Sequence, residues 1–294
     1  MNRECTTTIR GIAILIIIIG HVGVSGFDLR VFNPLGGIGV AMFLFLSGYG
    51  LTESYKNNGL GGFWRKKFLR IVIPYLVWIP LYHIVMRISP IGLPTQIQLI
   101  PRYWFIEYLI LAYIFFYFTF KYIKSYAIPI LIIIGIISFF TTNNLRAEQA
   151  FSFLCGILLS LKKSSFEKQN DKTVLIFSCT LFLIGATALF VKQLPMLRVY
   201  DLESIQFRFL NLFIKLPIGL SLILFTHLLI PKGNRTLMHI GNLSYELYLG
   251  HVPFFMSITG CVFRSFAFLI QSYLLAYVNY ALTQVINKKF YNHG

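Results

Sequence analysis

Two ionisable residues near the N-terminus frame an apolar segment. Arg10 and His21 stand at the ends of the run Gly11–Gly20, which contains only Gly, Ile, Ala and Leu. On an α-helix, this spacing places the two side chains within about 20° of the same face and about 16 Å apart along the axis. With Arg10 at one surface of a membrane, His21 lies near the midplane. Ionisable groups at that depth normally face a protein cavity, so His21 is a candidate for a functional site. The alternative is a neutral histidine that forms a hydrogen bond between helices.

The composition predicts the fold class. The 294 residues are 56% hydrophobic and only 12% charged, which is typical of a polytopic helical membrane protein. We expect an all-α fold of about ten transmembrane helices in a single domain, residues 1–294. The expected spans are about 9–26, 36–52, 69–88, 104–120, 125–142, 147–161, 173–191, 210–230, 239–258 and 264–286, with nine or eleven spans as the alternatives. We interpret the first as a retained helix, because further spans follow it directly.

The basic residues predict the orientation of these spans. Of the 26 Lys and Arg residues, seventeen fall on the side of the N-terminus, eight on the other side, and Lys215 inside a span. Because cytoplasmic loops are enriched in Lys and Arg, both termini are expected in the cytoplasm. The net charge of +16 then reflects topology and contact with anionic membrane lipid, and we expect no nucleic-acid partner.

A basic cluster opens the third span. It consists of Arg65, Lys66, Lys67 and Arg70, and the last two share a helix face because they are three residues apart. Such a group at a helix N-terminus can hold phosphates through its charges and through free backbone amides. The alternative is an anchor that contacts only lipid phosphates.

Two further patterns concern the packing of spans. Ser47 and Gly48 are small enough to let a ligand chain or another backbone pass within contact distance. Near the C-terminus, Ser244, Tyr248 and His251 fall at positions i, i+4 and i+7, so one stripe of a helix carries two hydroxyls and an imidazole. Such a stripe either lines a cavity or holds helices together.

Other chemistries lack their motifs. The four cysteines, Cys5, Cys155, Cys179 and Cys261, have no paired spacing and are interpreted as packing residues. The sequence contains no Walker-type phosphate loop, dinucleotide fingerprint or run of metal ligands. We therefore expect neither an ATP-driven pump nor a metal site.

Taken together, these motifs resemble the acyltransferase 3 family of integral-membrane acyltransferases. The residues that carry the resemblance occur in the expected order from about residue 8 to about residue 255: the Arg10 and His21 pair, Phe43–Tyr49, Lys67–Arg70 with Ile71 and Pro74, Tyr103–Phe105, and Leu243–His251. The resemblance implies a ten-helix enzyme of the bacterial cell membrane. It would be an O-acyltransferase that moves an acyl group, usually acetyl, from cytoplasmic acetyl-CoA to a hydroxyl of a cell-surface or lipid-linked glycan.

The resemblance also implies roles for individual residues. His21 matches the essential histidine of the family, and Arg10, Lys67 and Arg70 match residues associated with the acyl donor. Two departures matter: many relatives have an acidic residue in place of Ala41 and an arginine in place of Lys67. We therefore assign no acidic partner to His21, and we expect Lys67 to contact phosphate as a point charge.

The expected mechanism uses acyl-CoA and no metal. The phosphates of coenzyme A dock at the basic cluster, and the pantetheine arm passes Arg10 and the Ser47–Gly48 pair toward His21. There His21 acts as general base or as transient acyl carrier, and both roles require the neutral imidazole. The residues expected to line or support the acceptor cavity are Trp104, Glu107, Ser244, Tyr248 and His251, and Glu246 is a second acidic candidate.

Two other classes of protein share part of this pattern. A transporter or flippase of lipid-linked saccharides also has many spans with buried charges, but it is expected to contain duplicated halves, which this sequence lacks. A glycan polymerase or ligase needs a large outside loop, whereas the longest one expected here, about residues 192–209, is modest.

Overall fold

The computed structural model describes residues 1–27, 29–88, 101, 103–198, 201, 203–255 and 262–292. Over these residues the chain forms helices joined by short connections and no strand, which confirms the predicted all-α fold. The helices are α1 (Arg3–His21), the π-helical η1 (Val22–Gly26), η2 (Arg30–Phe32), α2 (Asn33–Asn58), α3 (Phe63–Lys67), the π-helical η3 (Phe68–Val72), α4 (Ile73–Ile88), α5 (Trp104–Tyr122), η4 (Lys124–Tyr126), α6 (Ala127–Thr141), α7 (Asn144–Ala147), α8 (Ser152–Leu161), α9 (Lys163–Glu167), α10 (Asp171–Lys192), α11 (Pro195–Arg198), α12 (Ile205–Leu229), α13 (Arg235–Asn242), α14 (Ser244–Phe255) and α15 (Val262–Asn292).

Within the described ranges, eight helical segments are long and apolar enough to cross a membrane, which confirms a polytopic membrane protein. They correspond to eight of the ten expected spans and are Arg3–Val24, Asn33–Asn58, Phe63–Val85, Trp104–Tyr122, Lys124–Thr141, Asp171–Lys192, Ile205–Leu229 and Ser265–Phe290. The other two expected spans consist of shorter pieces. The sixth contains the ten-residue α8, and the ninth is divided between α13 and α14. The helix α13 is amphipathic, with Arg235, His239 and Asn242 among its polar residues.

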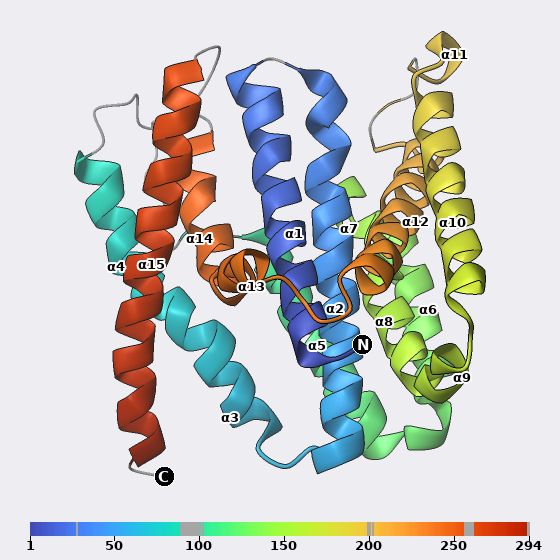
Figure 1. Cartoon of the computed structure of the whole chain (residues 1–294), viewed down its shortest axis with the longest axis horizontal. Coiled ribbons are helices and arrows are strands. Elements are labelled where there is room, and N and C mark those ends of the chain that lie inside the picture. The colour runs from blue at the N-terminus through green and yellow to red at the C-terminus, as the bar shows by residue number, and fades with distance from the viewer. Residues whose placement is uncertain are drawn as a thin grey trace.

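The helices α1 and α2 form the centre of the bundle (Figure 1). In that view α10 and α12 lie on one side of this pair, and α4, α14 and α15 lie on the other. Burial agrees with this arrangement. In an apolar stretch of 18 residues, 67% of the α2 stretch is buried inside the protein, but only 17% of the α10 stretch is. The outer helices α6, α10 and α15 expose many large apolar side chains, as helices that face lipid do. The helix α1 begins and the helix α15 ends in the lower half of Figure 1.

Glycines bring two pairs of helices into close contact. A Cβ atom at Gly11 of α1 would lie 2.1 Å from the carbonyl oxygen of Leu237 in α13, and one at Gly241 would lie 2.0 Å from that of Thr7. The same relation joins α2 and α8, where a Cβ at Gly48 would lie 2.1 Å from the Phe153 oxygen. No residue other than glycine fits at such distances. The close approach expected at Gly48 is thus used by another backbone, that of α8.

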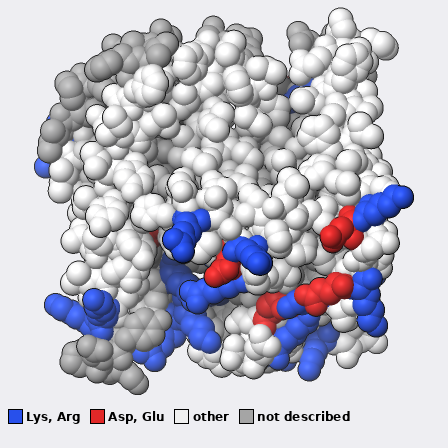
Figure 2. All heavy atoms as spheres, in the orientation of Figure 1, with Lys and Arg blue, Asp and Glu red and all other residues white. Residues whose placement is uncertain are grey.

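Charged side chains mark one end of the bundle. On the face drawn in Figure 2, Lys, Arg, Asp and Glu gather in the lower half, the half in which α1 begins and α15 ends in Figure 1. That this end is the cytoplasmic one stays a prediction from the distribution of Lys and Arg along the sequence.

The orientation is tested by cysteine labelling of the two ends of α2. Asn33 and Asn58 are both exposed and occupy its first and last positions. In a background without the natural cysteines, Asn33→Cys is expected to react with an impermeant maleimide added to intact cells. Asn58→Cys is expected to react only after permeabilisation. The opposite pattern would invert the topology and place the basic cluster outside the cell.

Candidate functional site

A cavity of about 580 Å³ opens between α1, α2, α3, α5 and α14. Its lining brings together basic residues from two segments that are distant in the sequence, namely Arg3, Arg10, Lys66, Lys67 and Arg70. Arg70 belongs to the π-helical η3, a kind of local helix widening that is frequent at functional sites. The cavity is therefore a concave, positively charged site that suits a polyanionic ligand.

Glu53 is the acidic side chain of this lining, and two lysines neutralise it. Its carboxylate lies 2.9 Å from the Lys163 ammonium and 3.2 Å from that of Lys56, and it accepts a hydrogen bond of 2.6 Å from Ser160. The hydrogen bond that the Lys163 ammonium donates to the Glu53 carboxylate raises the pKa of Lys163. Because its charge is matched locally, Glu53 does not cancel the attraction of the five basic residues for an anion.

Tyr113 of α5 lies at the centre of the basic group, although sequence reasoning did not select it. The Lys67 ammonium lies 4.7 Å from the centroid of its ring, within the range of a cation–π interaction. Its hydroxyl is within hydrogen-bonding reach of Ser47, which the cavity lining also contains. One tyrosine in an aromatic-rich span carries no signal in the sequence, because its neighbours come from other helices.

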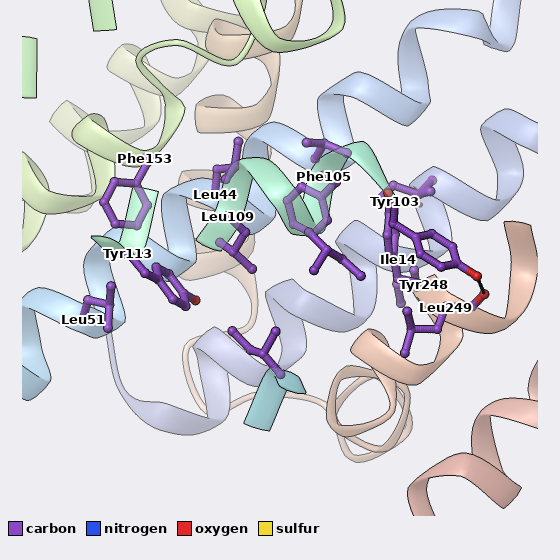
Figure 3. Close-up of a cluster of buried hydrophobic side chains, with 14 of the residues drawn as sticks. Ile14, Leu44, Leu51, Tyr103, Phe105, Leu109, Tyr113, Phe153, Tyr248 and Leu249 are labelled. Atoms are coloured by element: carbon purple, nitrogen blue, oxygen red, sulfur yellow. Dashed lines mark hydrogen bonds between the residues drawn. The ribbon is translucent and has the colours of Figure 1, made fainter. Parts of the chain in front are cut away.

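The inner end of the cavity is formed by Phe105, Ser244 and Tyr248. Figure 3 shows that Tyr113, Leu109 and Phe105 follow one another along α5 toward Tyr248. The Phe105 and Tyr248 rings meet edge to face, with centroids 5.0 Å apart. The Ser244 hydroxyl is already used, since it donates a hydrogen bond of 2.8 Å to the Gly241 carbonyl. Ser244 and Tyr248 of the predicted polar stripe thus reach the cavity.

His21 lies beyond this inner end and contacts His251. The two rings pack edge to face with centroids 4.9 Å apart, and the His251 ring is 5.4 Å from that of Tyr248. His21 Nδ1 donates to the Ile17 carbonyl at 2.8 Å, and His251 Nδ1 donates to that of Leu247 at 3.1 Å. In a neutral ring this places the proton on Nδ1, and the lone pair is then on Nε2. The His251 Nε2 is buried and has no hydrogen-bond partner among the residues that the structure describes.

Tyr103 fixes the position of α14 near the two histidines. Its hydroxyl accepts a hydrogen bond of 2.6 Å from the Trp78 indole and donates one of 3.1 Å to the Leu249 carbonyl, drawn as a dashed line in Figure 3. All three residues are buried. The motif around Tyr103 thus supports the segment that carries His251.

Four other predicted residues do not line the cavity. Arg65 donates to the Phe290 carbonyl at 3.1 Å, and Gly48 packs on α8. Trp104 packs its ring 6.3 Å from that of Phe105 at the start of α5. Glu107 forms an ion pair of 2.7 Å with Arg146 in a half-exposed position. For Arg65, Gly48 and Glu107 the neighbour lies on another helix, which spacing along the chain does not reveal.

The acidic candidates and Ala41 complete the predicted set. Glu246 is buried in α14 but is not part of the cavity lining. Ala41 is buried against α12, where a side chain at Gly219 would lie 3.2 Å from its Cβ. On α2 a Cβ added at Gly36 would lie 3.9 Å from the His21 Cε1.

A buried ion pair was missed by sequence reasoning. Lys215 of α12, the one basic residue placed inside an expected span, pairs with Glu148. Gln149 beside it donates to the Gly37 carbonyl at 2.9 Å, so the group ties α2 to the segment before α8. A lysine in an apolar span needs a buried partner, which was the available signal, but the sequence did not indicate which acid it was.

The comparison with known families agrees with these motifs. Residues 7–286 match the model of the acyltransferase domain Acyl_transf_3, so the chain belongs to the acyltransferase 3 family. The resemblance drawn from the motifs is thereby confirmed, and the protein is a multi-pass membrane acyltransferase. Comparisons with curated proteins and with solved structures gave no match.

Proposed function

We propose that this protein is an O-acetyltransferase of the bacterial cell membrane. It moves an acetyl group from cytoplasmic acetyl-CoA to a hydroxyl of a cell-surface or lipid-linked glycan. The observation that carries this proposal is the cavity, whose lining holds five basic residues and one acid that is neutralised by two lysines outside the lining. The inner end of this cavity adjoins the His251 and His21 pair. The family match over residues 7–286 supports a single acyltransferase domain.

The donor binds with its phosphates among Arg10, Lys66, Lys67 and Arg70. Guanidinium groups hold phosphate oxygens bidentately, and the lysines add point charges. The pantetheine arm then lies along the aromatic wall that Tyr113 and Phe105 form and points toward Tyr248. Arg65, which is bonded to the Phe290 carbonyl, takes no part in this site.

The chemistry takes place at Nε2 of His21. As general base, this atom removes the proton of the acceptor hydroxyl while the oxygen attacks the thioester carbonyl. The C–S bond then breaks, and the proton passes to the leaving thiolate. As acyl carrier, the same lone pair attacks the carbonyl first, the C–S bond breaks, and coenzyme A leaves as a thiolate while the acetyl group stays on Nε2. In a second step the acceptor hydroxyl attacks this acetyl group, the N–C bond breaks, and the hydroxyl proton passes to the thiolate. Both routes need the neutral imidazole, whose proton lies on Nδ1 in the hydrogen bond to Ile17 and whose lone pair is then on Nε2.

Tyr248 and His251 separate the cavity from His21. Tyr248 lines the cavity, and the His251 ring packs against both Tyr248 and His21. The acyl end of the donor therefore passes these two rings on its way to the reactive nitrogen. Because Tyr248 lines the cavity, we assign it to the route that the acyl group takes. Because His251 packs on His21, we assign it to the support of the His21 ring.

The proposal is tested with purified protein, radiolabelled acetyl-CoA and a lipid-linked glycan. The expected result is glycan that carries the label and release of free coenzyme A in equal amount. Mass spectrometry of surface glycan from a deletion strain identifies the sugar that loses its acetyl group. Transport of the saccharide across the membrane without labelling would support the flippase alternative.

A further inference from the structure

A second hollow adjoins the donor cavity on its membrane side. This groove of about 390 Å³ runs between the α3–η3 segment and α5, and its lining residues are Trp64, Arg65, Lys67, Phe68, Ile71, Val72, Ile110 and Tyr113. Trp64 and Phe68 are each 42% exposed and Ile110 is 37% exposed. All three lie on membrane-spanning segments, where an exposed apolar side chain faces lipid. The groove therefore opens toward lipid.

The groove combines an apolar floor with positive charge at one end. Phe68, Ile71, Val72 and Ile110 offer hydrocarbon, whereas Arg65 and Lys67 belong to the first turns of the span, where headgroups lie. An exposed tryptophan at this level is typical of the membrane interface. An anionic phospholipid matches both parts, because its acyl chain covers the floor and its phosphate meets the two cations.

The groove and the donor cavity share a wall. Lys67, Ile71 and Tyr113 line both hollows. The Lys67 ammonium lies 4.7 Å from the Tyr113 ring centroid and 5.6 Å from that of Phe63, a residue of the donor cavity. One ammonium thus stands between the two hollows, and an anion on either side interacts with the same charge.

We infer that the groove is a binding site for an anionic phospholipid and that its occupancy weakens donor binding. The lipid phosphate draws on the charge of Lys67, so the donor phosphates on the other side of the wall are held less tightly. Because such coupling is reciprocal, bound donor also weakens lipid binding. The regulatory half of this inference rests on the proposed function, whereas the lipid site itself does not.

The lipid site is tested by filling the groove. Ile110→Trp places a large side chain in it without touching the donor cavity. The matched control is Leu111→Trp, because Leu111 is the next residue of α5, is 44% exposed and lines neither hollow. In native mass spectrometry of protein from mixed nanodiscs, the parent and Leu111→Trp are expected to retain phosphatidylglycerol in preference to phosphatidylcholine. Ile110→Trp is expected to lose this preference. Equal retention by the two variants would overturn the site.

The coupling is tested by calorimetric titration of acetyl-CoA into nanodiscs. Adding phosphatidylglycerol to phosphatidylcholine is expected to raise the donor Kd of the parent and of Leu111→Trp about fivefold, the scale of typical coupling between sites. Ile110→Trp is expected to show only the smaller effect of membrane surface charge. An equal rise in both variants would overturn the coupling. Inorganic phosphate should compete equally in both, because it enters the donor cavity directly. Absence of donor binding even in phosphatidylcholine would contradict the proposed function. The lipid site would still be decided by the retention of phosphatidylglycerol in native mass spectrometry.

Discussion

His21→Ala is expected to reduce acetyl transfer by about 10²- to 10⁴-fold, the usual contribution of a general base. His21→Gln should be nearly as inactive, because an amide keeps a hydrogen bond but does not accept the proton. Acetyl-CoA binding should stay near the parent value, since His21 is not part of the cavity lining. Turnover and calorimetric binding, measured on the same preparations, separate these two effects.

Two other histidines serve as comparisons for this variant. His239→Gln removes an imidazole that bonds Tyr273 at 2.9 Å, away from the cavity, and should leave turnover unchanged. His251→Ala should retain partial activity, because it removes the ring that packs on His21 but leaves the reactive nitrogen. Transfer by His21→Ala at a rate comparable to the parent would return His21 to the role of a helix-packing residue.

Arg70→Ala is expected to weaken acetyl-CoA binding by about 1.5–3 kcal/mol, the cost of losing a hydrogen bond to a charged group. That corresponds to a rise in Kd of about 10- to 150-fold. We expect this loss of affinity because Arg70 lines the cavity together with Arg10 and Lys67. The effect should shrink at high salt, because the site is open to solvent that screens charge. Isothermal titration of the purified variant provides the measurement.

Lys172→Ala is the control for this second prediction. Lys172 is a basic residue in the first turn of α10, is exposed and does not line the cavity. Lys172→Ala removes one positive charge, as Arg70→Ala does, so it reports any general effect of net charge on acetyl-CoA binding. Equal affinities for Arg70→Ala and the parent would remove the basic cluster from the donor site.

The places where prediction and structure differ share a cause. Arg65 was grouped with Lys66 and Lys67 because they are adjacent, yet its guanidinium bonds the carbonyl of Phe290 in α15. Glu107 was a candidate partner for a neighbouring group, yet it pairs with Arg146. In both cases the deciding partner lies on another helix. Adjacent residues on a helix point about 100° apart, so proximity in sequence does not ensure a shared site.

The sequence by itself determined the all-α membrane class, eight of the expected spans, the family and the basic cluster of the third span. These follow from local composition and from motifs within one segment, because a membrane imposes its own length and polarity on each span. Only the tertiary structure decided that Tyr113 stands beside Lys67, that Lys215 pairs with Glu148, and that His21 meets His251. Each of these contacts joins residues from different helices. They depend on how the helices pack, through close contacts such as Gly11 on Leu237, and no pattern within a single segment encodes them.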